Sequence, residues 1–212
     1  MRKIKVGLAG FGRFSELVFL DILSNVPWEL VAIAENSEER RQVARKVSAK
    51  TRIVESYQEL LTLPDVEAVV ISLPSGLHSD AAKLAFQQGK HVYLEKPIGI
   101  NSIEAREVIK ACQDSKCIGM IGLNYRFHPF SMAAKKYFNT GNMKDIFYVR
   151  SSFASPMREL PKWQHSPETG GGALLHLATH HVDLIRFILD AEVKSVFSNL
   201  GSQKYLGDTA FL

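Results

Sequence analysis

The residues best suited to chemistry begin with two glycines that follow the first apolar run. Residues 4–9 (IKVGLA) lead directly into Gly10 and Gly12, and the third small position of the pattern is Ser15. In a strand–turn–helix unit that binds a dinucleotide, the first glycine makes the turn, and the second lets the backbone approach the pyrophosphate at the helix N-terminus. The spacing therefore predicts a dinucleotide-binding loop, whose cofactor-binding residues are Gly10, Phe11, Gly12, Arg13 and Phe14.

An acidic residue follows at the distance that such a loop requires. Glu35 lies 23 residues after Gly12, at the end of the second apolar run. A carboxylate there accepts hydrogen bonds from the adenosine ribose. It should also repel a 2′-phosphate, which predicts NAD as the cofactor. Arg40 and Arg41 follow closely enough to keep NADP as an alternative. A glycine turn in another kind of α/β protein is the competing interpretation.

Two histidines and an aspartate recur along one predicted helix. His176, His180 and Asp183 stand at i, i+4 and i+7, so they should share a face. They could be read as metal ligands, but Leu177 occupies the place where a zinc hydrolase carries Glu, and no metal is predicted. We expect Asp183 to support the helix or to pair with Arg186. The histidines suit either proton transfer or burial with local hydrogen bonds.

The elements that must position these residues alternate regularly through residues 1–123. Apolar runs alternate with amphipathic segments, which is typical of βαβ units and a parallel sheet. Ser37, Ser56 and Asn101 (with Glu104) are candidate helix caps. The predicted strands are 3–9, 29–35, 52–54, 67–72, 91–95 and 117–123, and the predicted helices are 13–25, 37–49, 57–62, 78–88 and 101–115.

Residues 124–212 read as an incomplete α+β domain. The predicted helices are 129–139 and 170–189, and the predicted strands are 145–152, 192–200 and 208–212. No sequence follows the last strand to pair with it, so a short sheet should expose unpaired edge and apolar surface. We expect that a partner chain covers this surface, which favours a homo-oligomer, or that the chain is shortened relative to its relatives.

Bulk composition excludes several classes of protein. The chain has 212 residues, 46% of them hydrophobic and 23% charged, with a net charge of +4. Its basic residues do not gather with aromatics, so a nucleic-acid partner is not expected. No apolar segment approaches the roughly 20 residues that span a bilayer, so no membrane partner is expected. Glycines interrupt any signal-peptide core, and Cys112 and Cys117 suit a reducing compartment, which together predict a cytoplasmic protein.

Further motifs occur in an order that resembles a known family. They are Leu73-Pro74 with His78, Glu95-Lys96-Pro97, residues 126–129 (RFHP), residues 170–180 (GGGALLHLATH) and residues 208–210 (DTA). Over essentially the whole chain they resemble the glucose–fructose oxidoreductase/inositol dehydrogenase family. The resemblance implies an N-terminal Rossmann-type domain with a doubly wound parallel sheet (residues 1–123) and a second, α+β domain (residues 124–212). It also implies oxidation or reduction of sugars, cyclitols and related carbonyl compounds with NAD or NADP.

The same resemblance assigns catalytic roles. Lys96 matches the lysine of the family's E-K-P motif, and hydride transfer from an alcohol needs a base for the hydroxyl proton. A free lysine titrates near pH ~10.4, but burial and a cationic nicotinamide would lower its pKa. The family commonly carries D-x-x-x-H on the later helix; His180 matches the histidine, and His176 stands at the aspartate position. The predicted catalytic residues are Lys96, His180 and His176, and a surface Lys96 paired with Glu95 is the alternative.

Other residues are expected around the nicotinamide and the substrate. The predicted cofactor contacts are Ser72, Leu73, Pro74, His78, Glu95, Lys96, Asn124 and Arg126. Pro97 would aim the lysine, through a cis bond, and Trp163 could close over a sugar or simply pack. The leading hypothesis is an NAD(P)-dependent oxidoreductase acting on a sugar or polyol. The alternatives are a non-catalytic dinucleotide-binding or sensing protein and an inactive, shortened family member.

Overall fold

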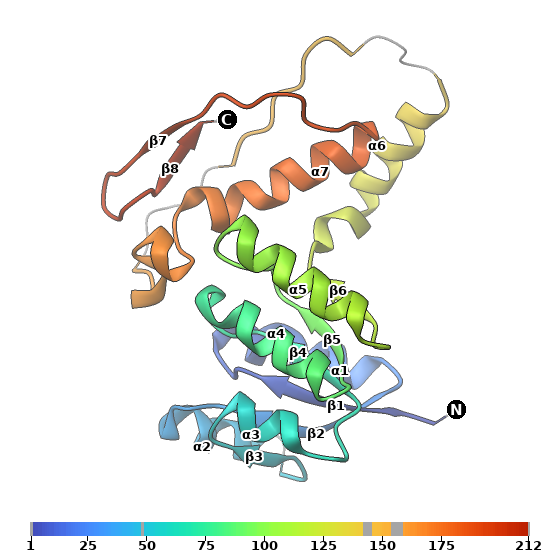
Figure 1. Cartoon of the computed structure of the whole chain (residues 1–212), viewed down its shortest axis with the longest axis vertical. Helices are drawn as coiled ribbons and strands as arrows, with labels where there is room; N and C mark the ends of the chain where they lie inside the picture. The colour runs from blue at the N-terminus through green and yellow to red at the C-terminus, as the bar shows by residue number, and fades with distance from the viewer. Residues whose placement is uncertain (1, 48, 142–145, 154–158, 212) are drawn as a thin grey trace. The chain divides into compact units, whose positions relative to one another are not determined.

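The computed structural model describes residues 2–47, 49–141, 146–153 and 159–211. The chain divides into two compact units, Met1–Gly122 and Leu123–Leu212 (Figure 1). None of the helices in the described ranges is long and apolar enough to cross a membrane. Each unit is described below by itself.

A six-stranded parallel sheet forms the centre of the first unit, as predicted. Its order is β3-β2-β1-β4-β5-β6, and every pairing is parallel. The order reverses between β1 and β4, and open α/β sheets bind ligands at the carboxyl ends of the strands at such a switch point. The strands are β1 (Ile4–Ala9), β2 (Trp28–Ala34), β3 (Arg52–Val54), β4 (Ala68–Ile71), β5 (His91–Leu94) and β6 (Gly119–Ile121).

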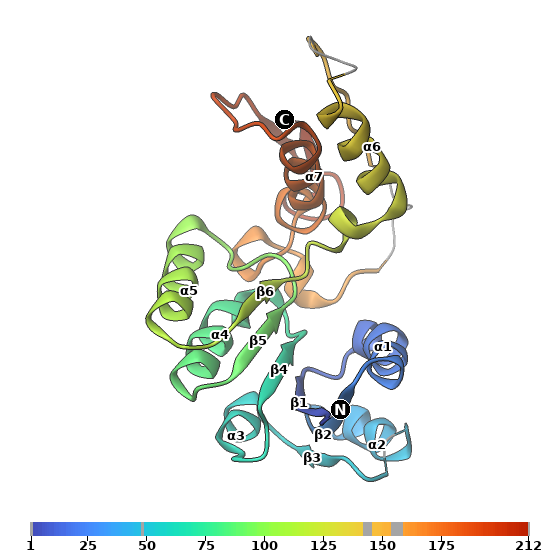
Figure 2. The same cartoon turned by 90° about the vertical axis from the view of Figure 1, so that its right-hand side faces the viewer.

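Helices cover both faces of this sheet, because its strands are apolar on both sides. In β4, Val69 and Ile71 face one buried layer and Val70 faces the other, as the two-residue period of a strand requires. Figure 2 shows α3, α4 and α5 on one face and α1 and α2 on the other. Their bounds are α1 (Leu20–Asn25), α2 (Glu38–Val47), α3 (Tyr57–Thr62), α4 (His78–Gln87) and α5 (Ser102–Asp114).

All three predicted helix caps are confirmed by hydrogen bonds, and the Ser37 hydroxyl accepts the Arg40 N–H at 3.4 Å. The Ser56 hydroxyl accepts the Glu59 N–H at 3.1 Å. At the start of α5, Asn101 Oδ1 accepts the N–H groups of Ile103 and Glu104, both at 2.9 Å. The Glu104 carboxylate in turn accepts the Ile100 N–H at 3.0 Å, so the reciprocal bond of a capping box forms one residue earlier than usual.

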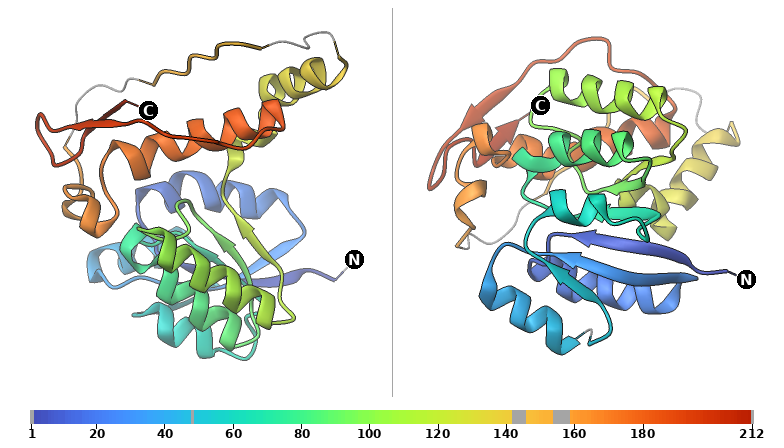
Figure 3. Two further views of the ribbon diagram at one scale, coloured as in Figure 1. Left: turned by 45° about the horizontal axis from the view of Figure 1, so that its top comes forward. Right: turned by 60° about the horizontal axis from the view of Figure 1, so that its bottom comes forward.

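The second unit contains two longer helices and a short hairpin. The helices α6 (Pro129–Asn139) and α7 (Thr179–Leu189) pack together, and the chain then returns as β7 (Asn199–Gly201) and β8 (Thr209–Phe211) (Figure 3). The last predicted strand therefore does have a neighbour, since Asn199 pairs with Phe211 and Gly201 with Thr209 in antiparallel register. The prediction that the last strand has no strand to pair with is wrong.

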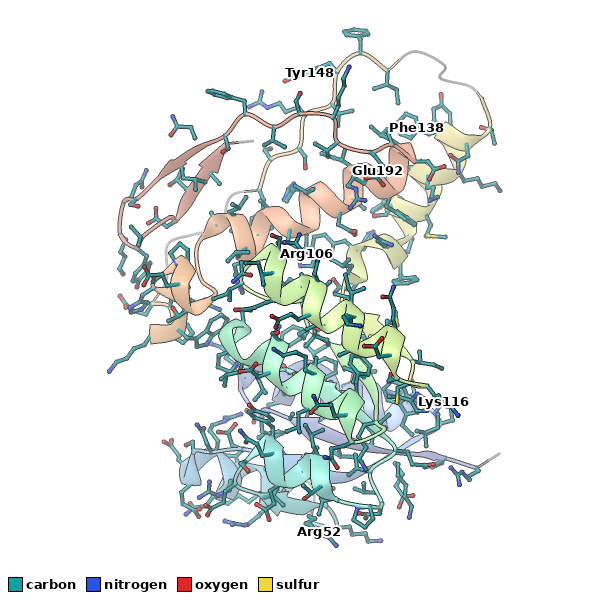
Figure 4. The ribbon with its side chains drawn as sticks, in the orientation of Figure 1. Arg52, Arg106, Lys116, Phe138, Tyr148 and Glu192 are labelled. Atoms are coloured by element: carbon teal, nitrogen blue, oxygen red, sulfur yellow. The ribbon has the colours of Figure 1, made fainter. Side chains whose placement is uncertain are left out.

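Two strand predictions in this unit are also wrong. Residues 146–152 form no strand, residue 145 lies outside the described residues, and of 192–200 only the last two residues enter β7. An apolar, β-branched pattern makes a strand only where another strand satisfies its backbone groups. Without one, the side chains are left in solvent: Phe147 is 100% exposed and Phe197 90%, and Tyr148 lies on the same extended segment (Figure 4). The expected exposed apolar surface is present.

The cap at Asn101 provides a stability test of the first unit. The variant Asn101→Ala loses both hydrogen bonds that the side chain accepts, so we expect its unfolding free energy to fall by about 1 kcal/mol. Urea denaturation followed by circular dichroism measures it. Gln113→Ala, at an exposed position of the same helix, is the matched control and should change stability little. Equal stability of both variants would contradict the assigned cap.

Candidate active site

The glycines of the dinucleotide loop, residues 10–14, differ in what surrounds them. Gly10 has φ +94°, and a Cβ there would lie 2.5 Å from the Ser72 carbonyl oxygen, so only glycine fits. A Cβ at Gly12 would meet no atom within 4 Å. The first glycine is thus needed by the protein's own packing, whereas the second keeps its backbone open to a ligand. This division fits the two roles expected for a pyrophosphate loop.

Ser15 occupies the third small position of the motif, where glycine or alanine is usual. Its side chain is fully buried, and its hydroxyl donates to the Gly10 carbonyl oxygen at 2.8 Å, which ties the turn to the helix that follows. That helix begins at Arg13 and contains a π-helical turn over Ser15–Phe19, a form often found at functional sites. The neighbours Arg13 and Phe14 are exposed. Serine is therefore small enough for this position, and its hydroxyl adds a hydrogen bond within the loop.

Glu35 reaches the loop from the end of β2. One carboxylate oxygen accepts the Phe11 N–H at 2.9 Å, and the other accepts the Ser37 N–H at 2.8 Å. A carboxylate has about four acceptor sites, so this leaves capacity for a ribose hydroxyl. Glu35 is half-buried, and it can hold the loop and accept from a nucleoside together.

The two arginines of α2 have partners within the unit. Arg40 donates to the Phe11 carbonyl oxygen at 3.0 Å and to the Glu16 carboxylate at 2.8 Å, and its guanidinium lies 5.2 Å from the centre of the buried Phe11 ring. Arg41 is buried and donates to the carbonyl oxygens of Glu35 and Asn36, both at 2.9 Å. A 2′-phosphate would have to draw either arginine away from these bonds.

The Glu95-Lys96-Pro97 segment follows β5 at the same edge of the sheet. The Lys96–Pro97 peptide bond is cis, as expected. Burial lowers the pKa of the Lys96 amine, and the neighbouring Glu95 carboxylate opposes that effect. Burial raises the pKa of Glu95, with Lys96 opposing it. The pKa of the Lys96 amine is therefore lowered, which is the direction that a catalytic base at neutral pH requires.

The structure adds two residues that the sequence reasoning missed. The Tyr93 hydroxyl bonds to the Glu95 carboxylate, and burial, followed by the Glu95 charge, raises the pKa of Tyr93 to about 12. Gly122 leaves room for this pair, because a Cβ there would lie 2.9 Å from Tyr93 Oη and 3.0 Å from Glu95 Oε1. The alternation of a strand, which places residues 93 and 95 on one side, was the signal that could have found the tyrosine.

The residues after β4 complete this edge. Ser72 donates its N–H to the Ala9 carbonyl oxygen at 2.8 Å, beside the dinucleotide loop. Ser72, Leu73 and Pro74 are half-buried. His78, by contrast, is only 1% exposed, and its ring nitrogens contact backbone carbonyl oxygens. The prediction that His78 contacts the cofactor is therefore wrong, because its buried ring is occupied by backbone groups of the protein itself.

In the second unit, Arg126, a predicted cofactor contact, bonds to Asp183. Its Nε lies 2.8 Å and 3.1 Å from the two carboxylate oxygens of Asp183, and Nη2 also contacts that carboxylate. The predicted pairing of Asp183 with Arg186 is wrong, since Arg186 pairs with Glu192 at 2.7 Å. Asp183 faces inward, where Arg126 can form a two-pronged bond, whereas Arg186 lies on the exposed side of α7. Asn124, beside Arg126, is exposed.

The two candidate catalytic histidines have different aromatic neighbours. His176 lies in a π-helical turn, Leu174–Ala178, and its ring is 6.0 Å from that of Trp163 at 76°. His180 stacks on Tyr125 with ring centres 4.3 Å apart at 15°. Within the described ranges, no three His, Cys, Asp or Glu residues are placed to share a metal ion. The helical run also starts later than predicted, at Ala173, because Gly170 and Gly172 have positive φ.

Comparison with known proteins gives matches over both units. Residues 4–123 match the model of an oxidoreductase family with an NAD-binding Rossmann fold, and residues 131–210 match the GFO/IDH/MocA C-terminal domain. Inositol 2-dehydrogenase from Rhizobium meliloti is 27% identical over 91% of this chain. Trans-1,2-dihydrobenzene-1,2-diol dehydrogenase from Xenopus laevis is 27% identical over 89%. The chain spans 57% of the length of each of these relatives.

A solved structure shows the same fold. The crystal structure of the WlbA dehydrogenase from Bordetella pertussis, in complex with NADH and UDP-GlcNAcA, superposes with a TM-score of 0.86. It is 26% identical, and the match covers 98% of this chain and 61% of that one. The similarity therefore runs through both units described here.

The two glycines of the loop provide a matched pair of variants. Gly12→Ala should fold like the parent but bind NADH at least tenfold more weakly, because its methyl group enters the space reserved for the ligand. Gly10→Ala should lose about 2 kcal/mol or more of stability, from strained φ and the collision with Ser72. Fluorescence titration with NADH and thermal denaturation measure the two effects. Normal NADH binding by Gly12→Ala would contradict the assigned loop.

Proposed function

The chain belongs to the GFO/IDH/MocA oxidoreductase family, and we propose that it transfers a hydride between a nicotinamide cofactor and a hydroxyl-bearing carbon of a sugar, cyclitol or related compound. Lys96 carries this proposal: a half-buried amine of lowered pKa lies at the same sheet edge as the open backbone of Gly12. A pyrophosphate site and a proton-transfer group at one edge are what such a reaction requires.

The dinucleotide loop fits NAD because its ligand side is clear. The backbone at Gly12, Arg13 and Phe14 would hold the pyrophosphate, and Glu35 would accept from the adenosine ribose. When bound, NAD supplies the hydride acceptor, and NADH supplies the hydride donor. The bonds that Arg40 and Arg41 already make, together with the Glu35 charge, support NAD over NADP.

Lys96 would handle the hydroxyl proton in either direction. As a neutral amine it accepts that proton while the alcohol carbon loses its hydride. As an ammonium it donates a proton to the carbonyl oxygen in the reverse reaction. Burial lowers the pKa of the amine from its ordinary value, which is the direction that favours exchange of this proton. The Glu95 carboxylate, which accepts a hydrogen bond from the Tyr93 hydroxyl, opposes this lowering of the Lys96 pKa.

His180 and His176 are proposed as further residues at the substrate. The stacking of His180 on Tyr125 limits rotation of its imidazole, which suits a group that receives a proton from a bound substrate. Trp163, whose ring is inclined at 76° to that of His176, offers an aromatic surface of the kind that can pack against a sugar.

The exposed apolar side chains of the second unit, including Phe147 and Phe197, support assembly of the chain into a homo-oligomer.

A second candidate is a non-catalytic protein that binds the dinucleotide as a sensor. His176 favours it, because an imidazole stands where the family resemblance leads us to expect an aspartate. The two functions separate in one experiment. Purified protein is offered NAD with a panel of aldoses and cyclitols, and NADH formation is followed by absorbance. NADH binding without turnover of any member would favour the sensor and contradict the oxidoreductase.

The lowered pKa of Lys96 predicts the pH dependence of oxidation. Only the neutral amine accepts a proton, so kcat/KM for the alcohol should rise with pH and level off above an apparent pKa lower than lysine's ordinary ~10.4. Lys96→Ala should lower kcat by about 10²–10⁴ while the NADH Kd changes little. The control Lys116→Ala alters an exposed lysine and should behave like the parent (Figure 4). Undiminished turnover by Lys96→Ala would refute the assigned base.

Glu35 predicts the choice of cofactor. The parent should bind NADH more tightly than NADPH. Glu35→Gln should reduce that preference about tenfold, because it removes the charge that repels a 2′-phosphate; tenfold corresponds to about 1.4 kcal/mol. Fluorescence titration with both cofactors measures it. Glu39→Gln, an exposed change on α2, is the control. Tighter binding of NADPH by the parent would overturn the assignment.

A further inference from the structure

One buried histidine joins the two backbone turns at the edge of the first unit. His78 Nδ1 lies 2.7 Å from the carbonyl oxygen of Pro97, and Nε2 lies 2.9 Å from the carbonyl oxygen of Leu73. Leu73 belongs to the turn after β4, residues 72–74, and Pro97 to the turn after β5, residues 95–97. The ring is 1% exposed, so it bonds to protein groups and leaves contact with a ligand to its neighbours.

Both partners of the ring are acceptors. A carbonyl oxygen cannot donate, so each bond requires a hydrogen on the ring nitrogen that faces it, and both form together only on a doubly protonated ring. Burial, the largest effect, lowers the pKa of His78, and the positive charge of Lys96 adds to it, while the two carbonyl bonds oppose it only in part. A neutral ring carries one N–H, so it donates to one carbonyl oxygen at a time and stays in contact with the other.

His78 is attached to a buried helix. It is the first residue of α4, and that helix is anchored by Ala81, Ala82 and Ala85, all of which are 0% exposed. The strand β5 is held as far as Glu95, whose N–H donates to the Ile71 carbonyl oxygen at 2.9 Å. Beyond Glu95, the Pro97 carbonyl is held by the ring of His78. The chain on either side of Lys96 is thus tied to the sheet and to α4.

We propose that His78 is a positioning residue, which fixes the amine of Lys96 through the Pro97 carbonyl and makes the turns after β4 and β5 move as one. The catalytic consequence rests on the proposed function, in which Lys96 transfers the hydroxyl proton. A histidine that merely stabilised the start of α4 would have no such effect on the lysine.

Two variants separate the bonds of the ring. In His78→Asn the amide nitrogen stands as many bonds from Cα as Nδ1, so it can still donate to Pro97. In His78→Gln the amide nitrogen matches Nε2 and can donate only to Leu73. Both variants lack the positive charge of a protonated ring, so a difference between them reports position rather than charge.

The readout is the titration of Lys96 in the full chain without cofactor. The protein is labelled with ¹³C-lysine, and the Lys96 signal is assigned by its loss in Lys96→Arg. We expect the Lys96 pKa in His78→Asn to stay closer to that of the parent. In His78→Gln it should rise by about one unit toward the ordinary lysine value, because the loosened turn exposes the amine. Amide spectra establish that both variants are folded.

His91→Asn is the matched control, since His91 lies at the other end of β5 and its Nδ1 accepts the Ile118 N–H at 2.9 Å. It should leave the Lys96 pKa unchanged. Equal Lys96 pKa values in His78→Asn and His78→Gln would overturn the proposal. Because no cofactor or turnover is involved, this result stands apart from the proposed function, which fails instead if the parent binds no NADH.

Discussion

The close approach of two backbones at the switch point of the sheet is the constraint on which the candidate site depends. Gly10 turns the chain so closely over Ser72 that a single added carbon would collide with a carbonyl oxygen. The same turn directs Gly12 away from the protein, where nothing competes for its surroundings. Tight packing on one side of the loop is therefore what leaves the other side open to a ligand.

Charged groups around this turn are used mostly by the protein itself. Glu35, Arg40 and Arg41 all bond to backbone of the loop or of the segment after β2. A network of this kind holds the loop in its binding shape before any ligand arrives, which reduces the entropy lost on binding. It also means that cofactor preference depends on which internal bonds a 2′-phosphate would break.

The two units differ in how completely their elements satisfy one another. Every strand of the six-stranded sheet has a parallel neighbour, and most of its apolar side chains are buried. In the second unit, residues 146–153 and 193–198 carry apolar side chains in extended backbone outside any strand pairing that the structure describes.

Local patterns in the sequence determined the Rossmann-type half, its helix caps and the dinucleotide loop, because these depend on spacing between near neighbours in the chain. Tertiary structure alone decided the pairing of Asp183 with Arg126, the carbonyl partners of His78 and the room that Gly122 leaves for Tyr93 and Glu95. The failed strands show the same division. Their composition favours extended backbone, but a strand also needs a neighbour to bond with, and no property of the segment itself supplies one.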